Sequence, residues 1–491
     1  MRGLHSNMKS IKKNLLYNIL LNVLSVISPL ITAPYVARVL EPDGVGLLNF
    51  SGTYAGYFAL VAALGIPTYG VRQVSKYRDN NEKLSKVVSQ LMTIAVITTL
   101  LVTFVFFMSI AFVGQLTENY IVFLVSGFSL YLSPIKVNWF FQGLEEFGYI
   151  TLRTLITQII GLICLFIFVH DKNDLIILIV IGLAGGLLAD ICNFVKMWNS
   201  GIRIKFTTDG LGEHIKHLLI LFASSIAISI YTILDTIMLG FISDYNEVGY
   251  YNYAVRLSKL LLMLVTSLSM VAVPRISYYM EQKEFGKINE LVNKSFSFVS
   301  FLAFPVAIGL MCVASTFVPL FLGEKYMGTV VPLVIMSLLI IAIGLNNLTG
   351  VQILIGMGYD KLFLYSVITG TLTNFSLNCL LIPNFGAVGA SVSSVVAEFL
   401  ILFVTTFYVY KATPIRISIR MDMLKSLFGA LLFIPIFLLL HSWLSGWLFV
   451  GSFVSICVLV YLFFESLVKN ASLDLLYKTI KGYFYKNEKI I

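Results

Sequence analysis

Apolar residues occur along the chain in blocks of roughly 18 to 25 residues, and short polar segments separate these blocks. An α-helix of that length crosses a hydrocarbon core about 30 Å thick, so each block is a candidate membrane span. We distinguish fourteen blocks, whose edges are good to a few residues: 14–39, 45–66, 87–113, 120–142, 150–169, 175–195, 217–242, 247–273, 295–322, 330–356, 362–382, 387–410, 427–444 and 447–468. The pattern predicts an all-α integral membrane protein with about fourteen transmembrane helices.

The composition agrees with this prediction. Of the 491 residues, 58% are hydrophobic and only 12% are charged. Soluble globular domains carry about 25% charged residues, so this balance is typical of a membrane protein and not of a soluble fold. The first block continues into a charged turn without a small-residue cleavage site, so we expect a retained span rather than a signal peptide.

The positions of Lys and Arg predict the orientation, because membrane insertion leaves basic short loops on the cytoplasmic side. If the N-terminus is cytoplasmic, 28 of the 34 Lys and Arg residues lie on that side, and only Lys172 and Lys325 lie in outer loops. We therefore expect both termini in the cytoplasm. The net charge of +9 follows from this bias and suits anionic lipids of the inner leaflet, so it does not indicate nucleic-acid binding.

An internal repeat indicates two related halves. GVGLLNF (44–50) matches EVGYYNY (247–253) at an offset of 203 residues, and GLEEF (143–147) is echoed by GYDKL (358–362). Six spans return the chain to its starting side, so we predict two parallel six-helix bundles related by a pseudo-two-fold axis along the membrane normal, a common transporter architecture. The predicted parts are an N-terminal bundle (1–195), a cytoplasmic linker (196–216), a C-terminal bundle (217–410), helices 13 and 14 (411–468) and a cytoplasmic tail (469–491).

The sequence carries no motif of catalytic or metal chemistry. It lacks a Walker A pattern, a GxSxG nucleophile elbow and an HExxH pair. His214 and His217 form an HxxH pair, but the surrounding loop is basic and has no Cys, so we expect a solvated loop rather than a metal site. Short outer loops leave no room for a catalytic domain. We expect a protein that is not an enzyme and that binds no metal and no cofactor, with H⁺ or Na⁺ as the candidate coupling ion.

Two cations in the eighth block are the leading candidates for a binding site. In YAVRLSKLLLML (253–264), Arg256 and Lys259 are three residues apart and therefore share one helix face with Asn252. A rise of 1.5 Å per residue places them roughly 14 to 18 Å deep, where a lipid-facing cation costs several kcal/mol. Both should thus face a wet interior. The alternative is a structural ion pair with an intramembrane acid such as Asp235.

Other polar residues of the blocks extend this candidate site. Arg38 ends a polar stripe on the first helix that includes Asn22, although Arg38 could instead reach the interface by snorkelling. Lys136 and Asp190 lie toward the cytoplasmic ends of their spans, where snorkelling is again the alternative. The predicted substrate-binding cations are Arg38, Lys136, Arg256 and Lys259, and the predicted polar lining is Asn22, Asn252, Asn374 and Asn378.

Three acids lie within the apolar blocks: Asp190, Asp235 and Glu398. A carboxyl group in a low dielectric holds its proton more tightly, so Asp235 or Glu398 could titrate or bind a cation in a coupled cycle. Equally, each acid could only neutralise Arg256 or Lys259. We predict a role for these acids in coupling or charge pairing and leave the two alternatives open.

The stretch TAPYVARVLEPDGVGLLNFSGTYAGYFALVAALGIPTYGVRQVSK (32–76), with WFFQGLEEF (139–147) and VGYYNYAVRL (248–257), strongly resembles the polysaccharide-transport branch of the multidrug/oligosaccharidyl-lipid/polysaccharide (MOP) exporter superfamily, the Wzx-type flippases. The resemblance covers predicted helices 1 to 12 in order. Arg38 and the Gln142-Gly143 turn match motif positions, whereas Glu41 stands where such proteins usually carry Gly.

This resemblance implies a MATE-like fold around a cavity and a location in the bacterial inner membrane. It implies a substrate, an undecaprenyl-pyrophosphate-linked repeat unit of O-antigen, capsule or exopolysaccharide, that crosses to the outer leaflet by alternating access. Implied partners are this glycan, membrane lipids, and polymerase and chain-length machinery. Arg256 and Lys259 suit a pyrophosphate. A multidrug or cation antiporter of the same superfamily competes, although the four intramembrane bases outnumber the three acids. A membrane-embedded polymerase or ligase is disfavoured by the short outer loops.

Overall fold

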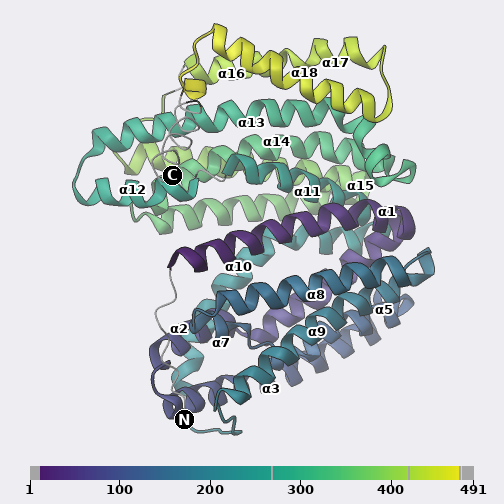
Figure 1. Cartoon of the computed structure of the whole chain (residues 1–491), viewed down its shortest axis with the longest axis vertical. Coiled ribbons are helices and arrows are strands. Elements are labelled where there is room, and N and C mark those ends of the chain that lie inside the picture. The colour runs from purple at the N-terminus through teal and green to yellow at the C-terminus, as the bar shows by residue number, and fades with distance from the viewer. Residues whose placement is uncertain (1–10, 267–268, 419–420, 475–476, 478–491) are drawn as a thin grey trace, which may run out of the picture. The chain divides into compact units, whose positions relative to one another are not determined.

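The computed structural model describes residues 11–266, 269–418, 421–474 and 477, and within them every regular element is a helix (Figure 1). The side chains of 11–16, 18–27, 224, 227–228, 230–232, 269–272 and 274 lie outside this description. The chain divides into two compact units, Met1–Phe241 and Ile242–Ile491. The predicted linker 196–216 follows from the internal repeat, which is a different criterion from compactness. It stays a prediction.

The first unit consists of long helices joined by short ones. Its elements are α1 (Ile11–Ala63), α2 (Ile66–Tyr77), α3 (Asn81–Phe112), α4 (Gly114–Glu118), α5 (Tyr120–Ser126), α6 (Phe128–Tyr131), η1 (Ser133–Ile135), α7 (Asn138–Gly143), α8 (Phe147–Phe168), η2 (Lys172–Asp174), α9 (Leu175–Asn199) and α10 (Gly212–Ile242). Its core gathers buried aromatic and aliphatic side chains of α2, α3 and α7, among them Trp139, Phe140 and Phe141.

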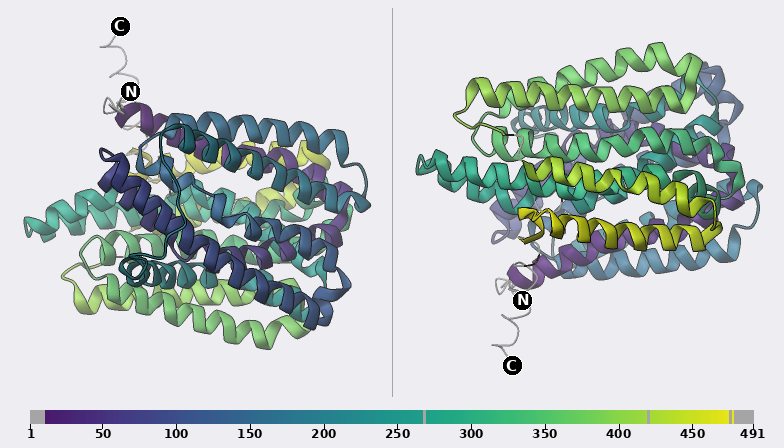
Figure 2. Two further views of the ribbon diagram at one scale, coloured as in Figure 1. Left: turned by 90° about the horizontal axis from the view of Figure 1, so that it is seen from below. Right: turned by 90° about the horizontal axis from the view of Figure 1, so that it is seen from above.

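The second unit contains α11 (Tyr245–Thr266), α12 (Ser269–Glu281), α13 (Phe285–Leu322), η3 (Glu324–Thr329), α14 (Val330–Asn346), the π-helical segment η4 (Asn347–Ile355), α15 (Asp360–Ala412), α16 (Met421–Leu431), α17 (Phe433–His441) and α18 (Gly446–Leu467). Helices α16 to α18, from the predicted helices 13 and 14, pack beside α13, as two views agree (Figures 1 and 2). Tyr461 of α18 fixes this contact by donating a 2.8 Å hydrogen bond to the carbonyl of Phe301.

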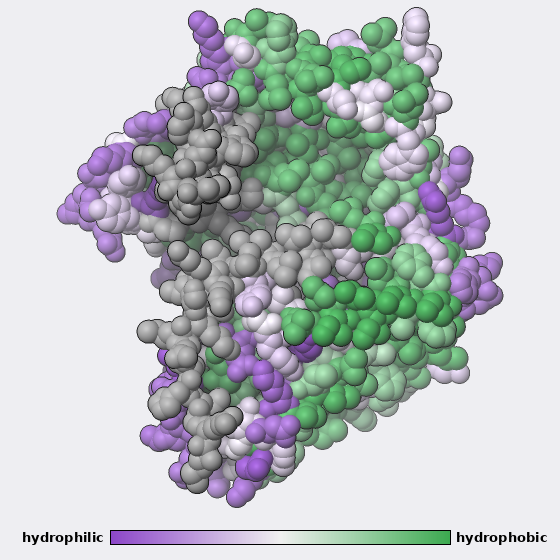
Figure 3. Space-filling view, in the orientation of Figure 1, coloured by the Kyte–Doolittle hydropathy of each residue, from purple (hydrophilic) through white to green (hydrophobic). Residues whose placement is uncertain are grey.

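Within the described part of the chain, nine helices are long and apolar enough to cross a membrane. Large apolar side chains on these helices are exposed; Leu100, Leu101 and Phe104 of α3 are 67%, 65% and 64% exposed. Apolar side chains also cover the outer faces of α8 and of α16 to α18, while hydrophilic side chains gather at helix ends such as that of α12 (Figure 3). The chain is therefore a multi-pass membrane protein, as predicted, and the count of fourteen spans stays a prediction.

Several predicted spans take a different form in the structure. Helix α1 contains two predicted blocks across a kink at Glu41, and α15 contains two across a kink at Gly386. The block 120–142 is broken into α5, α6, η1 and α7, because Pro134 removes a backbone donor and favours the end of a helix before it. This break positions Lys136 in a non-helical turn rather than on a continuous helix face.

The kink at Glu41 explains an oddity of the sequence. Glu41 has φ 60° and ψ 173°, in the half of backbone space where a Cβ is crowded. The resemblance predicts Gly at this position, and a Gly would adopt these angles without strain. Glu41 therefore holds a conformation that its side chain disfavours, at the turn that leads into Pro42.

The interpretation of HxxH as a solvated loop is wrong for His214. His214 is 6% exposed, and its ring bonds Tyr69 Oη through Nδ1 and Gln90 Oε1 through Nε2, each at 2.9 Å. Gln90 in turn donates from Nε2 to the carbonyl of Asp209 at 2.8 Å. The first turn of α10 is thus tied to α2 and α3 inside unit 1. Among the described residues, no three His, Cys, Asp or Glu side chains come together as a metal site.

Candidate functional site

The two cations of the eighth block lie one turn apart on α11 of unit 2, and both side chains are exposed. Met263, on the same stripe, is 47% exposed. Asn252 is half-buried and donates from Nδ2 to the carbonyl of Val248 within its own helix, at 2.9 Å. Among the described residues, the electrostatic neighbour given for Arg256 is the buried phenol of Tyr253. The stripe thus presents positive charge at its surface.

Asp235, the acid considered as a partner for these cations, belongs to α10 and to unit 1. Its side chain is half-buried and lies within electrostatic range of Tyr57. Tyr57 itself donates a hydrogen bond of 3.1 Å to the carbonyl of Ser229, also in α10. Whether Asp235 pairs with Arg256 or Lys259 stays a prediction.

A cavity of about 210 Å³ lies inside unit 1, among α1, α2, α3 and the broken segment from η1 to α7. Its wall is mostly apolar and includes Ala59, Pro67, Met92 and Trp139, and Lys136 is its charged lining residue. The Lys136 ammonium donates to the carbonyl of Ser129 at 2.7 Å and remains exposed. The cavity therefore offers an apolar wall next to one cation.

Lys136 belongs to a small group of charges in unit 1. Asp190 of α9 is half-buried and lies within electrostatic range of both Lys136 and Arg153. Arg153 of α8 bonds the carbonyl of Ala189 through Nη1 at 3.2 Å and Asn138 Oδ1 through Nη2 at 3.4 Å. Two cations thus share one acid, which leaves a net positive charge beside the cavity.

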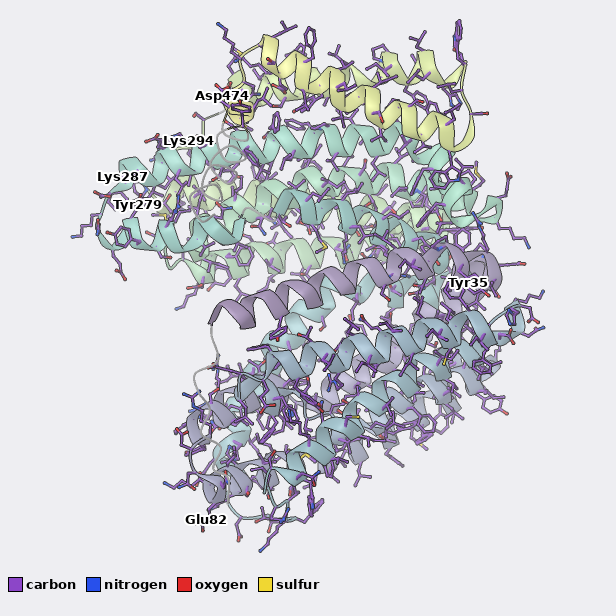
Figure 4. All side chains as sticks on the ribbon, viewed as in Figure 1. Tyr35, Glu82, Tyr279, Lys287, Lys294 and Asp474 are labelled. Atoms are coloured by element: carbon purple, nitrogen blue, oxygen red, sulfur yellow. The ribbon has the colours of Figure 1, made fainter. Side chains whose placement is uncertain are left out.

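The first-helix candidates are placed only in part. Arg38 of α1 is exposed and lies one turn before the kink at Glu41. Tyr35, on the preceding turn and labelled in Figure 4, donates a 2.6 Å hydrogen bond to the carbonyl of Val169, which holds this part of α1 against the end of α8. Asn22 lies in α1, but its side chain is outside the described residues.

Glu398 is the centre of a buried polar network in unit 2. It is 7% exposed and accepts a hydrogen bond on Oε2 from Asn346 Nδ2 at 3.5 Å. Asn346 Oδ1 accepts from Thr405 Oγ1 at 3.3 Å, and Thr405 Oγ1 lies 2.7 Å from Thr349 Oγ1. Thr349 belongs to the π-helical segment η4, and such segments often occur at functional sites. The carboxyl group is thus embedded among neutral oxygen and amide groups.

Asn374 and Asn378 also lie inside unit 2, 9% and 0% exposed. Asn378 donates from Nδ2 to Asn374 Oδ1 at 3.1 Å, one turn apart on α15. Both side chains are packed in the interior of the unit in this structure.

The structure adds residues that the sequence did not single out. The sequence places Arg153 among the basic residues of the cytoplasmic loops, yet in the structure it is half-buried and within electrostatic range of Asp190. Asn346, Thr349 and Thr405 were not assigned to Glu398. A seven-residue spacing puts Thr405, which bonds Asn346, on the same helix face as Glu398, so this member of the network had a signal in the sequence. Asn346 is 52 residues from Glu398, and no local pattern connects them.

Comparison with known proteins identifies the family. Residues 11–280 match the family described as polysaccharide biosynthesis protein, which is more than half of the chain. The chain belongs to this polysaccharide biosynthesis family. Residues 221–380 also match the MatE family. Together the two matches confirm the predicted Wzx-type branch of the MOP superfamily.

Individual relatives agree with this assignment. The chain is 25% identical over 409 residues to a protein of Escherichia coli (strain K12) named "Putative O-antigen transporter", an alignment that spans 83% of this chain and 98% of that protein. It is 29% identical over 169 residues to "Probable flippase AglR" of Haloferax volcanii, or 34% of this chain and 35% of the relative. These relatives carry the names of transporters and flippases rather than of enzymes, which agrees with the prediction that this family member is not an enzyme.

Solved structures support the fold. The structure resembles "Lipid II flippase MurJ, inward closed conformation" with a TM-score of 0.71 and 18% identity, over 92% of this chain and 98% of that one. It also resembles an inward-facing multidrug resistance MATE family transporter of the MOP superfamily with a TM-score of 0.60 and 15% identity, over 81% and 94% of the two chains. The predicted MATE-like fold is therefore confirmed.

Proposed function

We propose that the protein flips undecaprenyl-pyrophosphate-linked oligosaccharide repeat units from the cytoplasmic to the outer leaflet by alternating access. The family and the relatives named as an O-antigen transporter and a flippase support a lipid-linked glycan as substrate. The observation that carries the proposal is the exposed pair Arg256 and Lys259 on one stripe of α11, which the sequence predicts to be a membrane span. Placing a cation within the membrane costs free energy unless the cation binds a charged ligand or faces a water-filled cavity.

The chemistry of the substrate matches these side chains. A pyrophosphate needs concentrated positive charge where water is scarce, and an Arg guanidinium can bind two phosphate oxygens at once. Arg38 and Lys136 would supply further cations along the path. Asn252, together with Asn22, would hydrogen-bond sugar hydroxyl groups, and Asn374 and Asn378 would do so in a conformation that exposes them, while the prenyl tail remains in lipid.

We place the protein in the bacterial inner membrane with both termini in the cytoplasm. The excess of Lys and Arg on one side of the predicted spans supports this orientation. Polymerase and chain-length machinery would take over the flipped unit on the outer side.

Glu398 is our candidate for the coupling site. Its carboxyl group is buried and has amide and hydroxyl neighbours, an environment in which a proton or Na⁺ can neutralise the charge. Asp235 and Asp190 would act as charge partners of the cations. Binding of H⁺ or Na⁺ at Glu398 would bias one conformation over the other if the two states solvate the carboxylate differently.

A cation antiporter of the same superfamily is the second candidate. The MatE match over residues 221–380 and the buried acid Glu398 favour it. The exposed cations Arg256 and Lys259 disfavour it, because a cationic drug would be repelled by them.

The deciding experiment compares both activities in one preparation. Purified protein in proteoliposomes is given a fluorescent undecaprenyl-pyrophosphate oligosaccharide, and the fraction accessible to a membrane-impermeant quencher is followed with time. We expect a rate well above that of empty liposomes. Export of a cationic dye against a proton gradient without glycan flipping would instead establish the antiporter.

A further inference from the structure

Each unit carries a short non-helical segment that is bound to the face of a long helix. In unit 1 the segment 202–205 lies on α3. The backbone N–H of Arg203 donates to Ser85 Oγ at 3.3 Å, and Ser89 Oγ donates to the carbonyl of Arg203 at 3.3 Å. The N–H of Lys205 donates to Ser89 Oγ at 3.0 Å. We name 202–205 the first clasp.

The segment 415–418 of unit 2 repeats this arrangement on α13. The N–H of Arg416 donates to Asn289 Oδ1 at 2.9 Å, and Asn293 Nδ2 donates to the carbonyl of Arg416 at 3.1 Å. The N–H of Ser418 donates to Asn293 Oδ1 at 2.9 Å. We name 415–418 the second clasp.

The two clasps are equivalent in sequence as well as in contacts. The first reads IRIK and the second IRIS, 213 residues apart. Their helix partners Ser85 and Asn289 are 204 residues apart, close to the 203-residue offset of the internal repeat. In both clasps the leading isoleucine, Ile202 or Ile415, is fully buried while the arginine beside it is exposed. Because the two clasps match in sequence, in contacts and in burial, we expect them to have the same role.

Both arginines use one end of the guanidinium to bind the helix that precedes the clasp. Arg203 Nη1 donates to the carbonyl of Trp198 at 3.1 Å, near the end of α9. Arg416 Nη1 donates to the carbonyl of Tyr410 in the last turn of α15 at 3.3 Å, and to the carbonyls of Thr413 and Ile415, which follow the helix, at 2.9 Å each. Carbonyls at a helix end lack intrahelical partners, so these bonds fix the guanidinium in place.

Both arginines are exposed, and the structure gives hydrogen bonds for only one end of each guanidinium among the described residues. In the part of the chain that the structure describes, the Nε and Nη2 groups of Arg203 and Arg416 make no hydrogen bond, and neither arginine pairs with a carboxylate. Two N–H groups in a fixed fork match two oxygens of one phosphate. Each clasp therefore presents a positioned donor pair to an oxyanion.

The surroundings of the two clasps indicate where this oxyanion comes from. An aromatic ring lies beside each guanidinium: Trp198 at 5.1 Å and Tyr410 at 5.8 Å, 43% and 42% exposed. Each clasp also has an exposed lysine nearby in sequence: Lys205 is two residues after Arg203, and Lys411 directly follows Tyr410. Partly exposed Trp and Tyr rings are typical of the membrane–water interface, and neighbouring cations favour anionic lipid there.

We propose that the two clasps are equivalent binding sites for the phosphate of an anionic phospholipid headgroup, one in each unit. The arginine fork binds two phosphate oxygens, the aromatic ring lies at headgroup level, and the adjacent lysine adds charge. The assignment of both sites to the cytoplasmic leaflet rests on the orientation in the proposed function. The binding itself does not require that function.

Native mass spectrometry of the full-length protein in detergent, titrated with phosphatidylglycerol or phosphatidylcholine, tests this proposal. The wild type should retain two tightly bound phosphatidylglycerol molecules and no phosphatidylcholine. Arg203→Gln and Arg416→Gln should each retain one, and the double variant none, with at least tenfold weaker binding at each altered site. Glutamine keeps a donor for the helix carbonyls but loses the charged fork. The exposed Lys172→Gln is the matched control and should retain two.

A second pair of variants covers the case in which glutamine disturbs folding. Arg203→Lys and Arg416→Lys keep the charge without the planar fork and should bind the lipid with intermediate affinity. Retention of both lipids by the double Gln variant would overturn the proposal. So would displacement of the lipids by millimolar inorganic phosphate, which would make the clasps aqueous phosphate sites. Intact lipid binding in a chain that fails to flip glycan would count against the proposed function alone.

Discussion

The side-chain amide of Asn346 donates a hydrogen bond to the carboxyl group of Glu398, 3.5 Å away, and this contact joins the end of α14 to the middle of α15. Asn346 accepts a second bond from Thr405, so the carboxyl group belongs to a network rather than to a single pair. The next residue begins the π-helical segment Asn347–Ile355. Glu398 itself lies within α15, while its partner Asn346 lies where α-helical geometry gives way to the π-helical segment.

Glu398→Gln should abolish the dependence of flipping on the coupling ion and lower the rate at least tenfold. The amide keeps the shape and the bond to Asn346 but neither binds a proton nor neutralises a cation. Flipping in proteoliposomes is measured with and without proton and Na⁺ gradients. Thr405→Val, which removes a neighbouring hydroxyl but no charge, should keep the ion dependence. An unchanged response to both gradients in Glu398→Gln would remove Glu398 as the coupling site.

Arg256→Ala and Lys259→Ala should each reduce flipping while leaving expression intact. The double variant should have the lowest flipping activity. Loss of one charged hydrogen bond to phosphate costs about 1.5–3 kcal/mol, or roughly 10- to 150-fold in affinity. Glycan export is measured by complementation of a flippase-null strain. Met263→Ala, on the same exposed stripe, is the uncharged control. Normal export by the double variant would refute the role of both cations.

The fold class could be predicted because span length and hydropathy are local properties. The apolar blocks of α3, α8 and α9 need no partner to be recognised as membrane helices. The break within 120–142 is different. Pro134 was a visible signal, but the separate ends of α5 and α6 depend on packing that no short pattern encodes.

In the candidate site, only relationships between residues of the same helix could be predicted, because they follow from spacing in the sequence. A spacing of three residues from Arg256 to Lys259 is enough to put both on one face of α11. The bond from Asn346 to Glu398 joins residues 52 apart, and the burial of His214 depends on Tyr69 and Gln90 from two other helices. Contacts of that kind arise from tertiary packing, so the sequence alone placed the acid but not its partners.

Glu41→Gly should stabilise the protein, by up to about 1 kcal/mol. The kink holds Glu41 at φ 60°, which costs a non-Gly residue of order 1–3 kcal/mol, and the extra freedom of Gly in the unfolded chain offsets part of the gain. Thermal unfolding in detergent measures the effect. Glu290→Gly, the same change in regular helix, should destabilise instead by about 1 kcal/mol. A lower unfolding temperature for Glu41→Gly would contradict this prediction. It would mean that contacts of the Glu41 side chain stabilise the fold by more than its strained backbone destabilises it.

Gly143→Ala should destabilise unit 1 by about 1–3 kcal/mol. A Cβ at Gly143 would lie 2.6 Å from Cβ of Val74 and 2.9 Å from the carbonyl oxygen of Val71, so α2 and α7 would have to separate. Gly182→Ala is the control, because nothing lies within 4 Å of its Cβ position. Equal unfolding midpoints for the two variants would contradict the close approach of these helices.

The stability of unit 1 should depend on pH through His214. Burial is the main cause that lowers the pKa of His214; the nearby Glu213 opposes this shift and His217 adds to it. Because the folded-state pKa lies below the usual value of about 6.5, the unfolded chain binds the proton more tightly. This stabilisation is fully present above pH 6.5 and is lost as the pH falls through the folded-state pKa. Protonation would also put a second N–H on a ring whose partners are Tyr69 Oη and Gln90 Oε1.

His214→Gln should therefore flatten the fall in unfolding midpoint between about pH 6.5 and 5, since Gln can bond Tyr69 and Gln90 without titrating. Midpoints are measured in detergent for the wild type and the variant across this range. His170→Gln, in an exposed loop outside this network, should follow the wild type. Parallel curves for wild type and His214→Gln would show that another group controls the acid sensitivity, and that the buried imidazole only fills space between α2, α3 and α10.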